Sequence, residues 1–301
     1  MSSKTVIIIT GPTASGKTDL AIGIARHFNT SIISADSRQC FRELNAGVAK
    51  PDTAQLEMVK HFFINSHSIQ EDVNAAVFEN LAMQWSGQIF SERDTVVVCG
   101  GTGLYLRAFC EGLDEIPVID EGIRKNILAH YRDQGLPWLK ENIRLLDPLF
   151  YTSGETDNPQ RMMRALEVIQ STGRSLLSFR SHQKKQRPFR ILQFGIRLPR
   201  KELYQRINQR VDLMMEKGLL DEVKSLVPFR HLNALQTVGY SELFEYIQGK
   251  ISFEESISLI KQNTRHYAKR QMTWLNKNDE LVWLDNDYLN RIITYCGNAK
   301  I

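Results

Sequence analysis

The sequence predicts an α/β fold in which a parallel sheet forms the core and a helical segment is inserted into that core. Apolar runs rich in β-branched residues at 6–9, 31–35 and 95–99 are each followed by a polar or glycine-rich turn and then by helical patterns, the alternation typical of a parallel sheet. From about residue 117 to 190 strand signals are missing, and prolines and glycines separate short helical patterns. This stretch is therefore predicted to be the insertion.

The first apolar run leads into a glycine-rich loop with the pattern G-x-x-x-x-G-K-[ST], which is typical of phosphate-binding loops. Its glycines let backbone N–H groups turn toward phosphate oxygens, and the following helix adds the positive end of its dipole. Lys17 supplies a mobile charge, and the Thr18 hydroxyl can join the coordination sphere of Mg²⁺. The core is thus predicted to be P-loop NTPase-like, without a choice between a diphosphate and a triphosphate. The residues expected to bind phosphate are Gly11, Pro12, Thr13, Ala14, Ser15, Gly16, Lys17 and Thr18.

The composition is that of an ordinary folded protein of one or two domains: 301 residues, 42% apolar and 24% charged. The four cysteines are scattered without a C-x-x-C pair, so neither a disulfide framework nor a zinc site is predicted. Only four residues precede the first strand and no apolar run is long enough to span a bilayer, so we expect a cytoplasmic location. The net charge is +4, with basic residues gathered in the second half, which favours a polyanionic partner.

Polar residues follow the second and third apolar runs, at the sheet edge where open parallel sheets bind ligands. Asp36 comes directly after the second run. Two interpretations are open: a carboxylate that accepts a proton or holds a metal-bound water, or a helix N-cap. The third run ends in Gly100-Gly101-Thr102, where an NTP hydrolase usually has an acid. That ending argues against an ATPase, and the Thr102 hydroxyl can form a hydrogen bond to a ligand.

The remaining chain is predicted as a loop over 45–65, a covering helix over 73–89, the helical insertion over 118–183, and a second part of the core over 184–301 that follows the first part, 1–117. A strand is expected at 191–196 and another at 281–284, with one helix between 203 and 226. Arg206 and Arg210 lie four residues apart on that helix and can point the same way. Residues 264–274 alternate basic and aromatic side chains, as RNA-contacting helices often do.

Several strings together resemble one family, the bacterial tRNA dimethylallyltransferases, also called tRNA isopentenylpyrophosphate transferases. They occur in the family's order and span nearly the whole chain, which makes the resemblance far more specific than the phosphate loop alone. The strings are GPTASGKT at 11–18, DSRQ at 36–39, AKP at 49–51, GGTGLY at 100–105, DNPQRMMRALEV at 157–168, the helix with Arg206, Arg210, Gly218 and Leu219, VGY at 238–240, and residues 265–274.

The resemblance implies an enzyme that transfers a dimethylallyl group from dimethylallyl diphosphate to the exocyclic amine of the adenosine 3′ of the anticodon, with release of diphosphate and with Mg²⁺. It implies that Asp36 is the general base, that Thr102 contacts the adenosine, and that Lys17, Arg210 and the phosphate loop hold the diphosphate, with Thr18 at the metal. The tRNA contacts that it implies are Asp36, Ser37, Arg38, Gln39, Thr102, Arg124, Gln160, Arg161, Met162, Met163, Arg164 and residues 236–241.

These residue types suit the implied reaction. Because the lone pair of an adenine amine is delocalised into the ring, the amine needs to be held in place and to give up its proton to a base. Breaking the carbon–oxygen bond puts negative charge on diphosphate, which cations and backbone amides stabilise. The target base has to be unstacked, which favours a single-stranded loop as substrate.

The chain departs from the family pattern at two places. Phe41 stands where the family often has tyrosine, and residues 60–65 read KHFFIN in place of a His-His-Leu-Ile-Asp-like string. The zinc finger of eukaryotic members is also missing, so no zinc is expected.

Two alternatives remain open at the level of sequence: a small-molecule P-loop kinase, and an RNA-binding module that uses a nucleotide as a switch. We expect a monomer. Because bound RNA would cover the mouth of a cleft at the sheet edge, we also expect a second opening through the core by which the diphosphate substrate enters.

Overall fold

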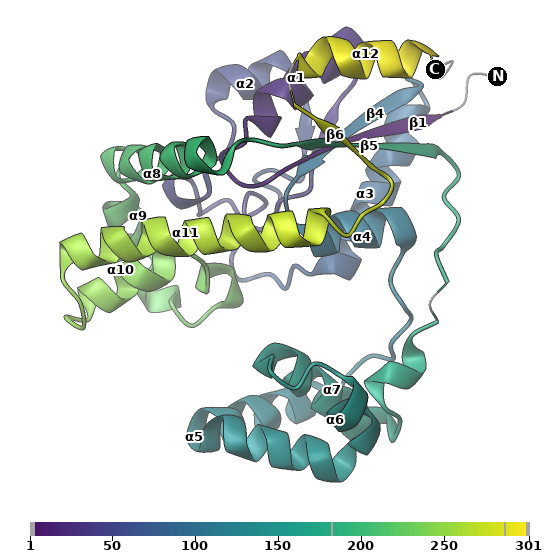
Figure 1. Ribbon diagram of the computed structural model, residues 1–301. Helices are drawn as coiled ribbons and strands as arrows, with labels where there is room; N and C mark the ends of the chain where they lie inside the picture. The colour runs from purple at the N-terminus through teal and green to yellow at the C-terminus, as the bar shows by residue number, and fades with distance from the viewer. Residues whose placement is uncertain (1–3, 182, 286, 299–301) are drawn as a thin grey trace. The chain divides into compact units, whose positions relative to one another are not determined.

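The computed structural model describes residues 4–181, 183–285 and 287–298, and Figure 1 shows their elements in chain order. The chain forms two compact units. The core unit consists of 1–111 and 186–301, and the helical unit is Gly112–Lys185. The insertion predicted over 118–183 therefore lies within the helical unit.

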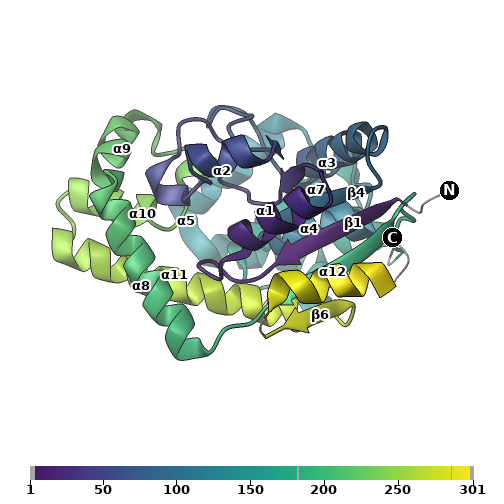
Figure 2. The same cartoon turned by 90° about the horizontal axis from the view of Figure 1, so that it is seen from above.

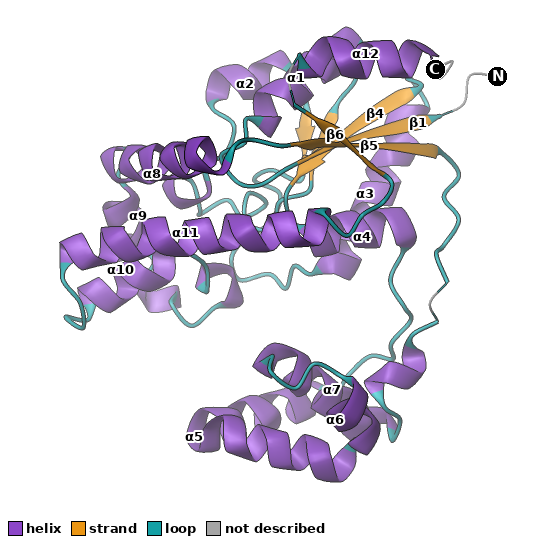
Figure 3. Cartoon of the chain, in the orientation of Figure 1, coloured by secondary structure: helices purple, strands orange, loops and turns teal. Residues whose placement is uncertain are grey.

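A six-stranded sheet with the order β3-β2-β4-β1-β5-β6 forms the centre of the core unit (Figure 3), and every strand pair in it is parallel. β1 and β4 are buried along their whole length, as parallel strands covered on both faces are. The predicted fold class is confirmed. The strands are β1 (Thr5–Thr10), β2 (Ile32–Ser34), β3 (His61–Phe62), β4 (Thr95–Gly100), β5 (Arg190–Ile196) and β6 (Leu281–Leu284).

Helices cover both faces of the sheet (Figures 1 and 2). On one face, Leu20 and Ile24 of α1 pack with Ile292 of α12 against β1. On the other face, Phe78 of α3 stacks on Tyr105 of α4 with ring centroids 4.6 Å apart. The helices of this unit are α1 (Lys17–His27), α2 (Thr53–Met58), α3 (Ala75–Phe90), α4 (Gly103–Glu111), α8 (Arg200–Glu216), α9 (Leu219–Ser225), α10 (Tyr240–Ile247), α11 (Phe253–Leu275) and α12 (Tyr288–Asn298), with 3₁₀ turns η1 (Ala46–Val48), η3 (Val227–Phe229) and η4 (Asn233–Leu235).

Two predicted segments differ from the structure. The single helix expected over 203–226 is wrong, because Gly218 has φ +87° and separates α8 from α9, as a left-handed glycine after a helix end does. The loop expected over 45–65 contains α2 and the edge strand β3. β3 has only two residues, so the sequence carries no alternating pattern for it, and its pairing with β2 defines it.

The helical unit packs α5 (Glu121–Leu146), α6 (Pro148–Ser153) and α7 (Pro159–Thr172) around its own apolar core, followed by the 3₁₀ turn η2 (Leu176–Phe179). α5 is interrupted at Gly135, whose φ is +70° and ψ −158°, two residues before Pro137. Met162 and Met163 are 0% and 4% exposed in this core. The apolar face of α7 turns both side chains inward onto α5 and α6, so it is the exposed residues of α7 that can present side chains to tRNA.

Among the residues that the structure describes, no helix is both long and apolar enough to cross a membrane.

Candidate active site

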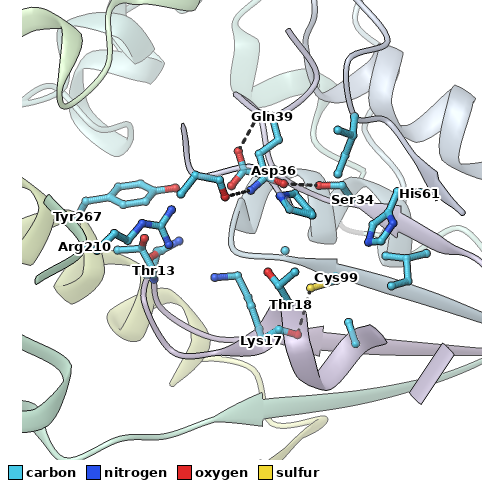
Figure 4. Close-up of a pocket in the computed structure, with 17 residues that line it drawn as sticks. Thr13, Lys17, Thr18, Ser34, Asp36, Gln39, His61, Cys99, Arg210 and Tyr267 are labelled. Atoms are coloured by element: carbon cyan, nitrogen blue, oxygen red, sulfur yellow. Dashed lines mark hydrogen bonds between the residues drawn. The ribbon is translucent and has the colours of Figure 1, made fainter. Parts of the chain in front are cut away.

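A pocket of about 600 Å³, here called the central pocket, opens where β1, β2 and β4 end. Figure 4 shows Lys17, Thr18, Asp36, Arg210 and Tyr267 around it. These side chains come from the phosphate loop with α1, from the turn after β2, and from α8 and α11. The sheet therefore brings together residues that lie far apart in the sequence, at the edge where parallel sheets bind ligands.

Two cationic side chains, Lys17 and Arg210, lie near the phosphate loop. Lys17 and Arg210 line both the central pocket and a second hollow of about 520 Å³ that borders residues 14–19, the phosphate hollow. The pKa of Lys17 and the pKa of Arg210 are both lowered, mainly by burial. The nearby Asp36 carboxylate opposes this shift without reversing it. Removing cations from water costs free energy that a bound anion returns. The pair is therefore suited to hold a multiply charged phosphate group.

Asp36 follows β2 and caps a turn, so the helix N-cap considered for it is wrong, because no helix begins there. Its Oδ1 accepts hydrogen bonds from the backbone N–H of Arg38 at 2.9 Å and of Gln39 at 3.3 Å, so it caps a turn. Both hydrogen bonds that backbone N–H groups of the described residues donate to this carboxylate end on Oδ1. The second oxygen is thus available to accept a proton in the pocket.

Thr102 is joined to the Asp36 turn by short contacts. Its Oγ1 accepts from the backbone N–H of Ser37 at 3.1 Å, and its own N–H donates to the carbonyl of Ala35 at 3.2 Å. A Cβ on Gly100 would come within 2.2 Å of that same Ala35 carbonyl oxygen. The glycines at the end of β4 therefore let the two turns approach closely, which places Thr102 beside Asp36.

Two residues of α11, Tyr267 and Gln271, belong to the site although the basic and aromatic pattern of 264–274 predicted no individual role for them. Gln271 accepts from the Thr13 N–H at 2.8 Å and donates to the Gly101 carbonyl at 2.9 Å, so it links the phosphate loop to the turn after β4. Tyr267 lines the central pocket, and its hydroxyl interacts with the Thr102 side chain; burial raises its pKa to about 12. Their spacing of four residues on one helical face was the available signal.

A third hollow of about 860 Å³, the base-side pocket, meets the central pocket at Thr13, Asp36, Arg210 and Tyr267. One of its walls is Gly47 and Val48, and another is residues 237–239. Arg210 lines all three hollows, so they adjoin one another at this side chain.

Gln39 fixes the remaining side of the Asp36 turn. Its Nε2 donates to the carbonyls of Ala49 at 3.1 Å and Val48 at 3.4 Å, and its Oε1 accepts from the Ser34 hydroxyl at 3.2 Å. The Arg38 and Ser37 side chains also line the base-side pocket. The four residues of the DSRQ string thus border one continuous space.

The arginines predicted to contact tRNA from the helical unit each have an acidic partner. Arg164 pairs with Glu167 at 3.0 Å, and Arg124 approaches the same carboxylate at 3.8 Å. Glu167 is only 7% exposed, so these arginines also compensate a buried charge. Arg161 pairs with Glu155, and Gln160 is exposed on the first turn of α7. On α8 of the core unit, Arg206 is exposed and pairs with Glu202 at 2.8 Å, whereas Arg210 lines the central pocket.

The positions that depart from the family pattern have structural contacts. Phe41 is 3% exposed, so its ring belongs to the core. His61 and Ile64 line the central pocket. Lys50 donates to the Phe41 carbonyl at 2.6 Å and to the Asn45 and Asn65 side chains at 3.1 and 2.5 Å.

Lys50 provides a prediction about stability and pH. Burial lowers its pKa to about 8 from an ordinary value of 10.5. Between pH 8 and 10.5 the unfolded chain holds a proton that the folded chain has lost, so this group makes the free energy of unfolding rise with pH across that window. We expect urea titrations to show a shallower rise for Lys50→Met than for wild type. Equal slopes for the two proteins would contradict the assignment.

The donor set near the phosphate loop fits Mg²⁺ in one particular way. Within the described ranges, no three His, Cys, Asp or Glu side chains converge as a metal cage. Thr18, however, lines both the central pocket and the phosphate hollow. Mg²⁺ is commonly held by one or two protein oxygens together with substrate phosphates and water, and this arrangement is what the loop offers.

A phosphate loop, a buried pair of cations and a carboxylate beside a second pocket define a phosphate-loop enzyme of the group-transfer class. The chain matches the family model described as IPP transferase over residues 39–278, and it belongs to this family, that of the tRNA dimethylallyltransferases. The family membership favours prenyl transfer over phosphorylation of a small molecule.

Named relatives and solved structures agree with this assignment. The tRNA dimethylallyltransferase 1 of Bacteroides thetaiotaomicron is 45% identical, with 97% of this chain and 94% of the relative covered. The tRNA dimethylallyltransferase of Cytophaga hutchinsonii is 43% identical over 97% and 96%. The crystal structure of the Bacillus halodurans tRNA isopentenylpyrophosphate transferase aligns with a TM-score of 0.71 at 32% identity, covering 98% and 95%. A eukaryotic dimethylallyltransferase acting on tRNA aligns with a TM-score of 0.77 at 26% identity, covering 99% and 77%.

Proposed function

We propose that this protein transfers a dimethylallyl group from dimethylallyl diphosphate to the exocyclic amine of the adenosine 3′ of the anticodon in tRNA. One observation carries the proposal: Asp36 lies where the central pocket, with its buried cations, meets the base-side pocket. A carboxylate at that junction can face both a diphosphate ester and a nucleoside. With tRNA as its substrate, the protein is proposed to act in the cytoplasm. We also propose that it acts as a monomer.

In this proposal Lys17, Arg210 and the loop amides hold the diphosphate and stabilise the negative charge that develops as the carbon–oxygen bond breaks. Asp36 accepts the proton of the adenine amine as the new carbon–nitrogen bond forms. Thr102, held by Ser37 and Tyr267, is placed to form a hydrogen bond with the base. Thr18 would hold Mg²⁺, which when bound neutralises charge on the diphosphate.

Arg210 lines all three hollows, so the phosphate hollow adjoins the base-side pocket, and we propose the phosphate hollow as the second entrance. RNA held at the base-side pocket would leave the phosphate hollow accessible, so dimethylallyl diphosphate could enter after tRNA has bound.

The function is tested by incubating the protein separately with ATP and with dimethylallyl diphosphate plus unmodified tRNA. We expect prenyl incorporation into tRNA in the second mixture and no comparable ATP hydrolysis in the first. Phosphorylation of a small molecule, or ATP turnover without prenyl transfer, would support a kinase and overturn the proposal.

The helical unit yields a prediction for RNA binding. Arg161→Ala and Arg164→Ala are each expected to weaken tRNA binding and to reduce the slope of log K against log salt by about 1, because fewer counterions are released. Affinity for dimethylallyl diphosphate should stay unchanged. Filter binding at several salt concentrations measures both effects, with Arg144→Ala as the control, an exposed arginine paired with Glu141. Unchanged slopes in both variants would remove α7 from the interface.

A further inference from the structure

A carboxylate outside the proposed catalytic set joins two walls of the base-side pocket. Glu222, on α9, accepts hydrogen bonds from the backbone N–H of Asn45 and Ala46, both at 2.9 Å, and of Gly47 at 3.3 Å. It also accepts from the hydroxyl of Tyr240 at 2.5 Å. Three successive amides and a phenol thus converge on one charge, and hydrogen bonds to a charged acceptor are the strong ones.

The Tyr240 side chain is too deeply buried to meet RNA itself. It is 0% exposed, and burial together with the Glu222 charge raises its pKa, so it remains a donor at neutral pH. A Cβ on Gly47 would lie 2.5 Å from the Tyr240 ring. The loop backbone therefore rests directly on this ring, and Tyr240 follows residues 237–239, which line the base-side pocket, directly in the chain.

The loop that Glu222 holds also supports the Asp36 turn. Its Val48 and Ala49 carbonyls accept the hydrogen bonds of Gln39. Ala49 has φ +42°, a left-handed conformation that costs free energy outside glycine and persists only where neighbours enforce it. Lys50 holds the loop from the opposite side through the Asn45 side chain.

We propose that Glu222 is a positioning residue for the nucleoside half of the site: through residues 45–49 and Tyr240 it sets the separation of the two walls that receive the target adenosine. The inference rests on the proposed function. A misplaced base loses the near-attack geometry that transfer needs, whereas the diphosphate contacts of Lys17 and Arg210 lie elsewhere and should persist.

The test replaces Glu222 by glutamine, which keeps the size but turns an NH₂ group toward N–H and O–H donors. With an anticodon stem-loop RNA and dimethylallyl diphosphate, we expect kcat/KM for the RNA to fall by about tenfold or more, while KM for the diphosphate stays within about twofold of wild type. Tyr240→Phe removes one of the four hydrogen bonds and should lower kcat/KM for the RNA by about threefold.

Glu43→Gln is the matched control, because Glu43 likewise accepts from a backbone N–H, that of Ile69 at 3.0 Å, and from the Ser68 hydroxyl at 2.7 Å. The residues that it holds line none of the three hollows, whereas Glu222 holds Gly47 of the base-side pocket. A merely structural role would reduce the folded fraction of Glu222→Gln and leave kcat/KM for the RNA, expressed per folded enzyme, at the wild-type value. Wild-type kinetics in Glu222→Gln, or KM values for the two substrates that rise together, would overturn the inference.

Absence of transfer by the wild type would instead overturn the proposed function. In that case binding of the same stem-loop decides the inference. Glu222→Gln should weaken this binding by about tenfold relative to Glu43→Gln if the walls hold a nucleoside, and equal binding by the two variants would overturn it.

Discussion

Replacing Asp36 by asparagine is expected to lower kcat by about two to four orders of magnitude while dimethylallyl diphosphate binds nearly as well as to wild type. The amide oxygen of asparagine can still accept the Arg38 and Gln39 N–H groups that Oδ1 holds now, so the turn is kept. What is lost is the oxygen that takes the proton of the adenine amine. Single-turnover prenyl transfer, together with calorimetric binding of the diphosphate, measures the two effects separately.

Asp120→Asn is the matched control for this variant. The Oδ1 of Asp120 accepts the N–H groups two and three residues ahead, those of Gly122 and Ile123, which is the same capping pattern on a different unit. It should change kcat little. Turnover of Asp36→Asn close to wild type would contradict the general-base role.

Lys17→Met is expected to lower kcat/KM for dimethylallyl diphosphate by about two to three orders of magnitude, the usual loss when one preorganised group that stabilises developing charge is removed. Methionine fills a similar volume but carries no charge, and of the loop's contacts it loses the hydrogen bond from Lys17 to the Pro12 carbonyl at 3.2 Å. Burial of Lys17 and Arg210 in the same region makes each cation worth more than it would be in water. Steady-state kinetics with varied diphosphate substrate at saturating tRNA measures the loss.

Lys60→Met serves as the comparison, because Lys60 is exposed and lies over the Phe62 ring at 4.6 Å. Its kinetics should match wild type. A Lys17→Met enzyme whose KM for the diphosphate and kcat both stay within about twofold of wild type would show that the phosphate loop does not bind this substrate.

The sequence predicted the sheet class and the phosphate loop because both are local. A β-branched run, a glycine pattern and a helix within 20 residues carry their own geometry, and α1 begins at Lys17 as expected. Residues 36–39 and 100–105 were placed near the loop by the rule that parallel strands end at one edge, and the pockets that Asp36 shares with Lys17 and Arg210 agree with that rule.

Other features depended on contacts between segments that no short pattern records. β3 exists because β2 supplies its hydrogen bonds. Met162 and Met163 belonged to a string that resembles an RNA-contacting segment, yet the amphipathic packing of α7 buries them. A string defines which residues are present, whereas the direction in which each side chain points follows from what its helix packs against.

The sequence by itself determined the fold class and the phosphate loop, because both follow from short stretches of local geometry, and the resemblance of its strings to one family supplied the residues of the proposed chemistry. Only the tertiary structure decided which distant side chains complete the site: Tyr267 and Gln271 from α11, and Glu222 under residues 45–47. The physical reason is that hydrogen bonds across 170 or more residues, such as those of Glu222 to Asn45 and of Gln271 to Gly101, form only when separate elements pack against one another.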